Sequence, residues 1–147
     1  MVAALPDLDG VPSSVLDQGY LAVDGEVEVR VRRDGATHVL TVKGGRGLVR
    51  TEVEVELGAE RFAALWPLTE GRRVEKTRHL LPGAAGLFQI DVYRGVLRGL
   101  VVAEMEFASE AEAAAFVPPP WLGAEVTGDR RYRNAALARA QQAPAEE

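Results

Sequence analysis

Charged residues alternate strictly with valine in two segments of this chain, and no other feature constrains the fold as strongly. From Glu26 to Arg33, valine occupies every second position and glutamate or arginine stands between. From Thr51 to Leu57, glutamates alternate with valine and leucine in the same way, and a third extended run, Thr37 to Lys43, lies between the two segments. Side chains two positions apart share one face of a β-strand. We therefore expect three consecutive strands with charge on one face and apolar side chains on the other.

Further extended segments are separated by turn-forming pairs such as Asp24-Gly25 and Pro82-Gly83. They lie at residues 18–23, 72–81, 87–93 and 100–107. Helices are expected at 58–65, at 109–116 behind a capping box from Ser109 to Glu112, and at 132–142. Strands joined by short loops predict a mainly β (α+β) protein with an antiparallel sheet curled into a barrel and helices packed outside it. Residues 1–17 are expected to form a loop or arm, and residues 18–147 a single domain.

Composition narrows the chemistry. The chain carries a formal net charge of −5, whereas a nucleic-acid-binding domain normally has a basic excess. No apolar run approaches the ~20 residues that a membrane-spanning helix needs. We therefore expect no nucleic acid and no membrane among its partners, and a cytoplasmic location. With no cysteine and only two histidines, a metal would be a hard ion held by carboxylates, Mg²⁺ or Mn²⁺.

The charged strand faces admit two interpretations. In the first, the faces are solvated and their ion pairs contribute about 0.2–1 kcal/mol each. In the second, they line the inside of a barrel, where the bases bind a polyanion and the acids hold a metal. Bases and acids fall on separate strands, which favours the second interpretation. The bases are Arg30, Arg32, Lys43, Lys76 and Arg78, and the acids are Glu52, Glu54, Glu56, Asp91, Glu104 and Glu106.

The chain resembles the CYTH superfamily, the triphosphate tunnel metalloenzymes, over residues 18–137. The resemblance rests on Gln-Gly-Tyr-Leu at 18–21, Arg-Val-Arg at 30–32, Thr-Val-Lys-Gly at 41–44 and Thr-Glu-Val-Glu at 51–54, and it continues through 70–78, Asp91, 100–106 and 121–130. It implies an antiparallel eight-stranded tunnel barrel. It also implies hydrolysis of inorganic triphosphate, or of a nucleoside or other organic triphosphate, with magnesium or manganese.

The resemblance also assigns roles to residues. It implies that the five bases Arg30, Arg32, Lys43, Lys76 and Arg78 bind phosphate, and that Lys76 and Arg78 take part in catalysis together with Asp91. Glu54, Glu104 and Glu106 are implied as metal ligands. Bases of this kind neutralise phosphate oxygens, and a carboxylate-bound metal orients an attacking water.

The sequence departs from the family at one point. Family members begin with a strand bearing Glu-x-Glu-x-Lys, and nothing before Gln18 supplies it. We therefore expect seven strands and an open barrel, with unpaired edges at residues 18–23 and at the last strand. Such edges favour a homodimer. Two functions stay open: hydrolysis of a triphosphate, or binding of polyphosphate or nucleotide without catalysis.

Overall fold

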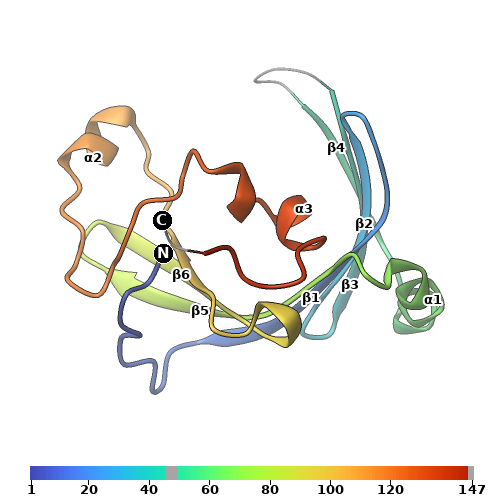
Figure 1. Cartoon of the computed structure of the whole chain (residues 1–147), viewed down its shortest axis with the longest axis horizontal. Coiled ribbons are helices and arrows are strands. Elements are labelled where there is room, and N and C mark those ends of the chain that lie inside the picture. Colours follow the sequence, from blue (N-terminus) through green and yellow to red (C-terminus); the bar gives the residue numbers. More distant parts are fainter. Residues whose placement is uncertain (46–49, 146–147) are drawn as a thin grey trace.

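The computed structural model describes residues 1–45 and 50–145, and in this part of the chain seven strands form one antiparallel sheet. The strand order β4-β3-β2-β1-β5-β6-β7 leaves the sheet curled but open (Figure 1). The expected seven strands and open barrel are confirmed. The glycine-rich turn at 44–47 lies partly outside the described residues. The strands are β1 (Ser13–Asp24), β2 (Val27–Asp34), β3 (Thr37–Gly44), β4 (Thr51–Glu56), β5 (Arg73–Gly83), β6 (Gly86–Tyr93) and β7 (Val101–Glu104).

The first strand differs most from expectation. β1 begins at Ser13, so residues 13–17 belong to the sheet and not to an arm. It pairs with β2 on one side and with β5 on the other, so the sheet edges are β4 and β7, and residues 18–23 are not an edge. Residues 16–20 are all buried because both faces of this central strand are covered. A strand buried on both faces shows no polar alternation, which is why its start was missed.

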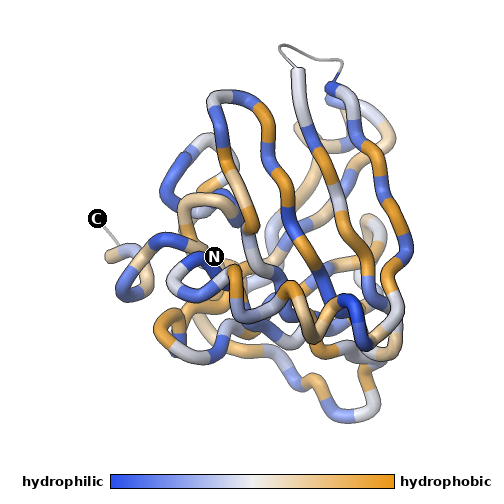
Figure 2. The backbone as a smooth tube through the Cα atoms, turned by 90° about the vertical axis from the view of Figure 1, so that its right-hand side faces the viewer, coloured by the Kyte–Doolittle hydropathy of each residue, from blue (hydrophilic) through white to orange (hydrophobic). Residues whose placement is uncertain are grey.

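Strand register gathers the charged side chains on one face. Arg30 lies opposite Tyr20 on β1 and Thr41 on β3, and Thr41 lies opposite Glu54 on β4. At the other end of the sheet Arg78 lies opposite Asp91. We call this the inner face, because it faces the hollow of the curled sheet, and the opposite one the outer face. Figure 2 shows the hydropathy alternating along the strands, as the sequence predicted.

Helices cover the two faces unequally. On the outer face, α1 (Ala59–Leu65) places Phe62 against Val31 and Leu57, as expected for the first inserted helix. The exposed fraction of Val53 and Val55 on β4 is nonetheless 52% and 50%, so no helix covers that edge. The second helix, α2 (Glu110–Ala115), buries none of its residues. The remaining short elements are the 3-10 turns η1 (Trp66–Thr69), η2 (Gly95–Leu97) and η3 (Arg130–Tyr132).

The last helix lies inside the curl of the sheet, not outside it (Figure 1). α3 (Asn134–Leu137) is shorter than the expected 132–142. Its Leu137 is fully buried in a cluster that includes Tyr20, Val74 and Tyr93 of the inner face. The inner face therefore carries an apolar cluster around Leu137 as well as charged side chains. No helix among the described residues is long and apolar enough to cross a membrane.

Candidate anion-binding site on the inner face

A cavity of about 940 Å³ occupies the hollow. Of the residues proposed from sequence, Arg30, Lys43, Glu104 and Glu106 line it. Arg32, Lys76, Arg78 and Asp91 share the inner face by register but do not form its wall. Glu28 and Arg50 also line the cavity and were not proposed from sequence, although Glu28 is in phase with Arg30 and lies opposite Lys43. The five bases thus lie on one face, at different depths.

Lys76, Arg78 and Asp91 form a closed cluster on β5 and β6. The Asp91 carboxylate has no exposed surface and accepts hydrogen bonds from both bases. Arg78 donates twice, from Nε to Oδ1 at 2.7 Å and from Nη2 to Oδ2 at 2.8 Å, and Lys76 Nζ donates to Oδ2. The carboxylate therefore fixes both bases in place, and in this arrangement Asp91 contacts the bases and not the cavity.

Burial shapes the protonation of this cluster. Desolvation lowers the pKa of Lys76, against the attraction of Asp91. The hydrogen bond to Asp91 raises the pKa of Arg78. Burial raises the pKa of Tyr93, whose ring centroid lies 5.4 Å from Lys76 Nζ. The cluster thus lies in a poorly solvated environment, where electrostatic interactions are stronger than in water.

The bases on β2 lie in a different environment. Arg30 Nε and Arg32 Nε are buried and have no hydrogen-bond partner among the described residues, and the same holds for the hydroxyl of Thr41 on β3. Buried polar atoms without partners are uncommon and costly. Three of them lie on two neighbouring strands, so this part of the inner face has hydrogen-bonding capacity that the described residues leave unused.

The carboxylates proposed as metal ligands lie on both edges of the sheet. Glu54 is on β4, whereas Glu104 ends β7 and Glu106 follows it. Among the described residues, no three histidine or acidic side chains are gathered at metal-binding distance. Lys43 Nζ lies 3.5 Å from Glu52, and Arg78 Nη2 lies 3.9 Å from Glu104. The first of these pairs joins neighbouring strands and the second joins β5 to the next strand but one, so the carboxylates are dispersed along the inner face beside the bases.

Sequence reasoning missed the neutral polar residues of the inner face. Gln18 and Tyr20 are buried on β1, and Gln18 Nε2 donates to the Tyr20 hydroxyl at 3.2 Å. Burial raises the pKa of Tyr20. Thr41 has an exposed fraction of 1%. Its phase with Lys43, two residues later, was the available signal, but only the register with β2 brings it next to Arg30.

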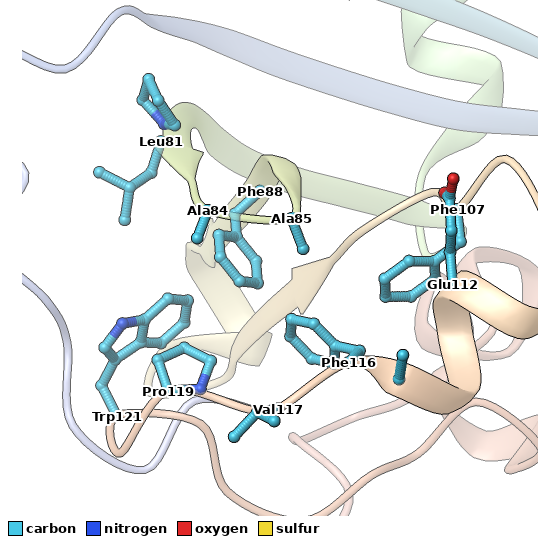
Figure 3. Close-up of a pocket in the computed structure, with 12 residues that line it drawn as sticks. Leu81, Ala84, Ala85, Phe88, Phe107, Glu112, Phe116, Val117, Pro119 and Trp121 are labelled. Carbon is cyan, nitrogen blue, oxygen red and sulfur yellow. The ribbon is translucent and has the colours of Figure 1, made fainter.

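An apolar pocket of about 570 Å³ adjoins the cavity (Figure 3). The rings of Phe88, Phe116 and Trp121 surround it, with Phe88 and Trp121 edge to face at 4.9 Å between centroids. Phe88, Phe107 and Phe116 also line the charged cavity. One end of the anion site therefore has an aromatic wall.

The chain is similar to known proteins in both sequence and structure. No protein-family model matches the sequence. The chain is 48% identical over 143 residues to an inorganic triphosphatase of Nitrosomonas europaea, which covers 94% of this chain and 92% of the relative. It is 39% identical over 122 residues to an inorganic triphosphatase of Acetivibrio thermocellus, which covers 82% of this chain and 77% of that one. A crystal structure of the inorganic triphosphatase NE1496 matches with a TM-score of 0.82 and 44% identity, over 95% of this chain and 90% of that one.

Proposed function

Because this chain belongs to the inorganic triphosphatase family, we propose that it hydrolyses inorganic triphosphate on the inner face of its sheet. The observation that carries the proposal is the set of five bases on that face, of which Arg30 and Arg32 have buried donors without partners. A face that carries five bases favours a polyanion as its ligand. We further propose that the fold belongs to the CYTH superfamily and that the protein acts in the cytoplasm.

The two groups of bases divide the work of binding. Arg30 and Lys43 line the cavity and meet the phosphate oxygens directly, and Arg32 extends the same row of bases. Lys76 and Arg78 are already oriented by Asp91, so little reorganisation is needed when charge develops on the reacting phosphate. Preorganised charge of this kind is the main protein contribution in phosphoryl transfer.

The carboxylates suit Mg²⁺ or Mn²⁺ in chemical type. Mg²⁺ commonly keeps several waters and is held by one or two carboxylates plus substrate phosphates, which agrees with acids that are dispersed rather than gathered. We infer that Glu104 and Glu106, which line the cavity, would hold the ion from the β7 edge, and that Glu54, which does not line it, would do so from the β4 edge. When bound, such an ion neutralises phosphate oxygens and orients water.

Phosphate release from triphosphate, measured with and without magnesium, tests the proposal. Wild-type protein should release phosphate, and Lys43→Ala and Arg78→Ala should each raise the KM because a charge-assisted hydrogen bond worth about 1.5–3 kcal/mol is lost. Arg61→Ala is the matched control, since Arg61 is exposed on α1 beside the outer face. Triphosphate binding without phosphate release at any metal concentration would favour the alternative, a non-catalytic polyphosphate- or nucleotide-binding protein.

Titration of magnesium tests the proposed ligands. Glu54→Gln, Glu104→Gln and Glu106→Gln keep the side-chain shape but remove the charge, so each should need more metal for half-maximal activity. Glu60→Gln on α1 is the control. Metal-free triphosphate binding should be unchanged or tighter in the three variants, because negative charge near the phosphates is lost. Weaker metal-free binding would contradict the assignment.

A homodimer through the sheet edges remains a proposal, now with β4 and β7 as the edges. Antiparallel pairing of β4 with its own copy about Glu54 would place glutamate opposite glutamate, since Glu52, Glu54 and Glu56 share one face. Like charges directly opposite each other are destabilising. Association through β4 should therefore strengthen with salt in sedimentation experiments, and a salt-independent monomer would exclude it.

A further inference from the structure

Thr41 is the third of four residues in a row that crosses the inner face from β1 to β4. Its register partners are Arg30 on β2 and Glu54 on β4. The residue is almost completely buried, and its hydroxyl oxygen has no hydrogen-bond partner among the described residues. A valine would fill the same volume without leaving a polar atom unpaired. The hydroxyl is therefore a cost to the ligand-free protein.

Arg30 has a hydrogen-bond donor that lacks an acceptor. Its Nε is buried and without a partner, although the side chain lines the anion cavity. Thr41 does not line that cavity. Arg30 thus has a free Nε donor, and Thr41, directly opposite it on β3, has a free hydroxyl acceptor, while Arg30 also interacts with the hydroxyl of Tyr20 on its β1 side.

We propose that Thr41 is a positioning residue for Arg30. When a phosphate group engages the terminal guanidinium nitrogens, the Arg30 Nε–H donates to the Thr41 hydroxyl, which fixes the plane of the guanidinium. A fixed plane matters because arginine binds phosphate through a rigid, planar set of donors. The inference rests on the proposed function for the identity of the anion, and it adds to that function a residue that does not touch the substrate.

The test compares Thr41→Val with Thr41→Ser, which keeps the hydroxyl. Thr77→Val is the matched control, a partly buried threonine of β5 on the outer face. Thr41→Val should raise the KM for triphosphate about tenfold, the loss expected for one hydrogen bond to a charged group, while kcat stays unchanged. Its melting temperature without ligand should equal or exceed that of the wild type. Thr41→Ser should restore the KM, and Thr77→Val should leave it unchanged.

A double-mutant cycle separates positioning from other effects. In an Arg30→Ala background, Thr41→Val should have no further effect on KM, because the group that it positions is gone. A wild-type KM for Thr41→Val, or the same tenfold loss in both backgrounds, would overturn the inference. Thr41→Ala serves as the second variant if valine prevents folding.

Failure of the proposed function is distinguishable from failure of this inference. If the wild-type protein releases no phosphate, the proposed function fails, and the same cycle is measured as the Kd for triphosphate by calorimetry. A loss for Thr41→Val that disappears in the Arg30→Ala background still supports the inference. A Kd that Thr41→Val leaves unchanged overturns it.

Discussion

Two base-x-base motifs lie on the inner face, and they differ in whether their side chains have hydrogen-bond partners. Lys76 and Arg78, two positions apart on β5, share the fully buried carboxylate of Asp91. Arg30 and Arg32, also two positions apart, keep buried Nε donors without partners among the described residues. The difference comes from what the register places opposite: the acidic Asp91 lies opposite Arg78, whereas the neutral residues Tyr20 and Thr41 lie opposite Arg30. A base-x-base pattern therefore does not reveal whether its charge is available to a ligand.

This contrast assigns different roles to the two halves of the face. The Lys76–Arg78–Asp91 cluster is internally satisfied, so its first contribution is to the folded structure and to preorganisation. The Arg30–Arg32 pair keeps buried Nε donors without partners among the described residues, and Arg30 lines the cavity, so its contribution is to binding. Substitutions in the two halves should therefore have different effects on stability and on binding.

Removing Asp91 should destabilise the folded protein, because Lys76 and Arg78 lose their shared partner. Asp91→Ala leaves Lys76 and Arg78 without their shared carboxylate in a buried site. Loss of one partner from a buried ion pair costs about 3–5 kcal/mol, and the free energy of unfolding from urea denaturation should fall by that amount. Arg30→Ala, in the other half, should change it far less. Equal losses in both variants would remove the distinction between the halves.

Alkaline pH should lower the unfolding free energy through Tyr93, which lies beside Lys76 of the Lys76–Arg78–Asp91 cluster. Burial raises its pKa above the ordinary value of 10.0. Above pH 10 the unfolded chain releases a proton that the folded protein keeps, so the unfolding free energy should fall with rising pH, by up to about 1.4 kcal/mol per pH unit. The raised pKa of Tyr20 lowers the unfolding free energy with rising pH in the same way. Lys76, whose pKa is lowered from 10.5, raises the unfolding free energy with rising pH below pH 10.5. The unfolding free energy of Tyr93→Phe should therefore fall less steeply, as measured by denaturation from pH 9 to 11.

The smallest expected change in unfolding free energy concerns the ion pair of Lys43 on β3 and Glu52 on β4. Their charged atoms are 3.5 Å apart, and both side chains are partly exposed. Exposed pairs contribute about 0–1 kcal/mol and are screened by salt. Glu52→Gln should therefore change the unfolding free energy by less than about 1 kcal/mol, and by less still in high salt. A larger, salt-independent loss would show that Lys43 and Glu52 form a buried ion pair like that of Lys76 and Asp91.

Sequence alone predicted the features that depend on local periodicity. Alternation of valine with charge between residues 26 and 57 placed the strands and assigned Arg30, Arg32 and Lys43 to one face. The first inserted helix followed from the spacing of Phe62, Leu65 and Trp66. In each case the signal lies within about ten residues, and the strand or helix period is sufficient to recognise it.

The features that were missed depend on distant pairing. Asp91 was proposed as a catalytic residue from the resemblance, but only the β5–β6 register and the side-chain contacts reveal that it binds two bases. Thr41 is unremarkable until it is placed opposite Arg30. The position of α3 inside the curl depends on the cluster around Leu137, which joins residues more than 100 positions apart, such as Tyr20. None of these relations has a local sequence signal.

The central claim is that Arg30 and Arg32 receive the triphosphate. It is tested most directly by calorimetric titration of inorganic triphosphate into metal-free wild-type protein, Arg30→Ala, Arg32→Ala and the control Arg61→Ala. We predict that each of the first two variants binds about 10- to 100-fold more weakly, while the control binds as the wild type does. Wild-type affinity in both Arg30→Ala and Arg32→Ala would contradict the account.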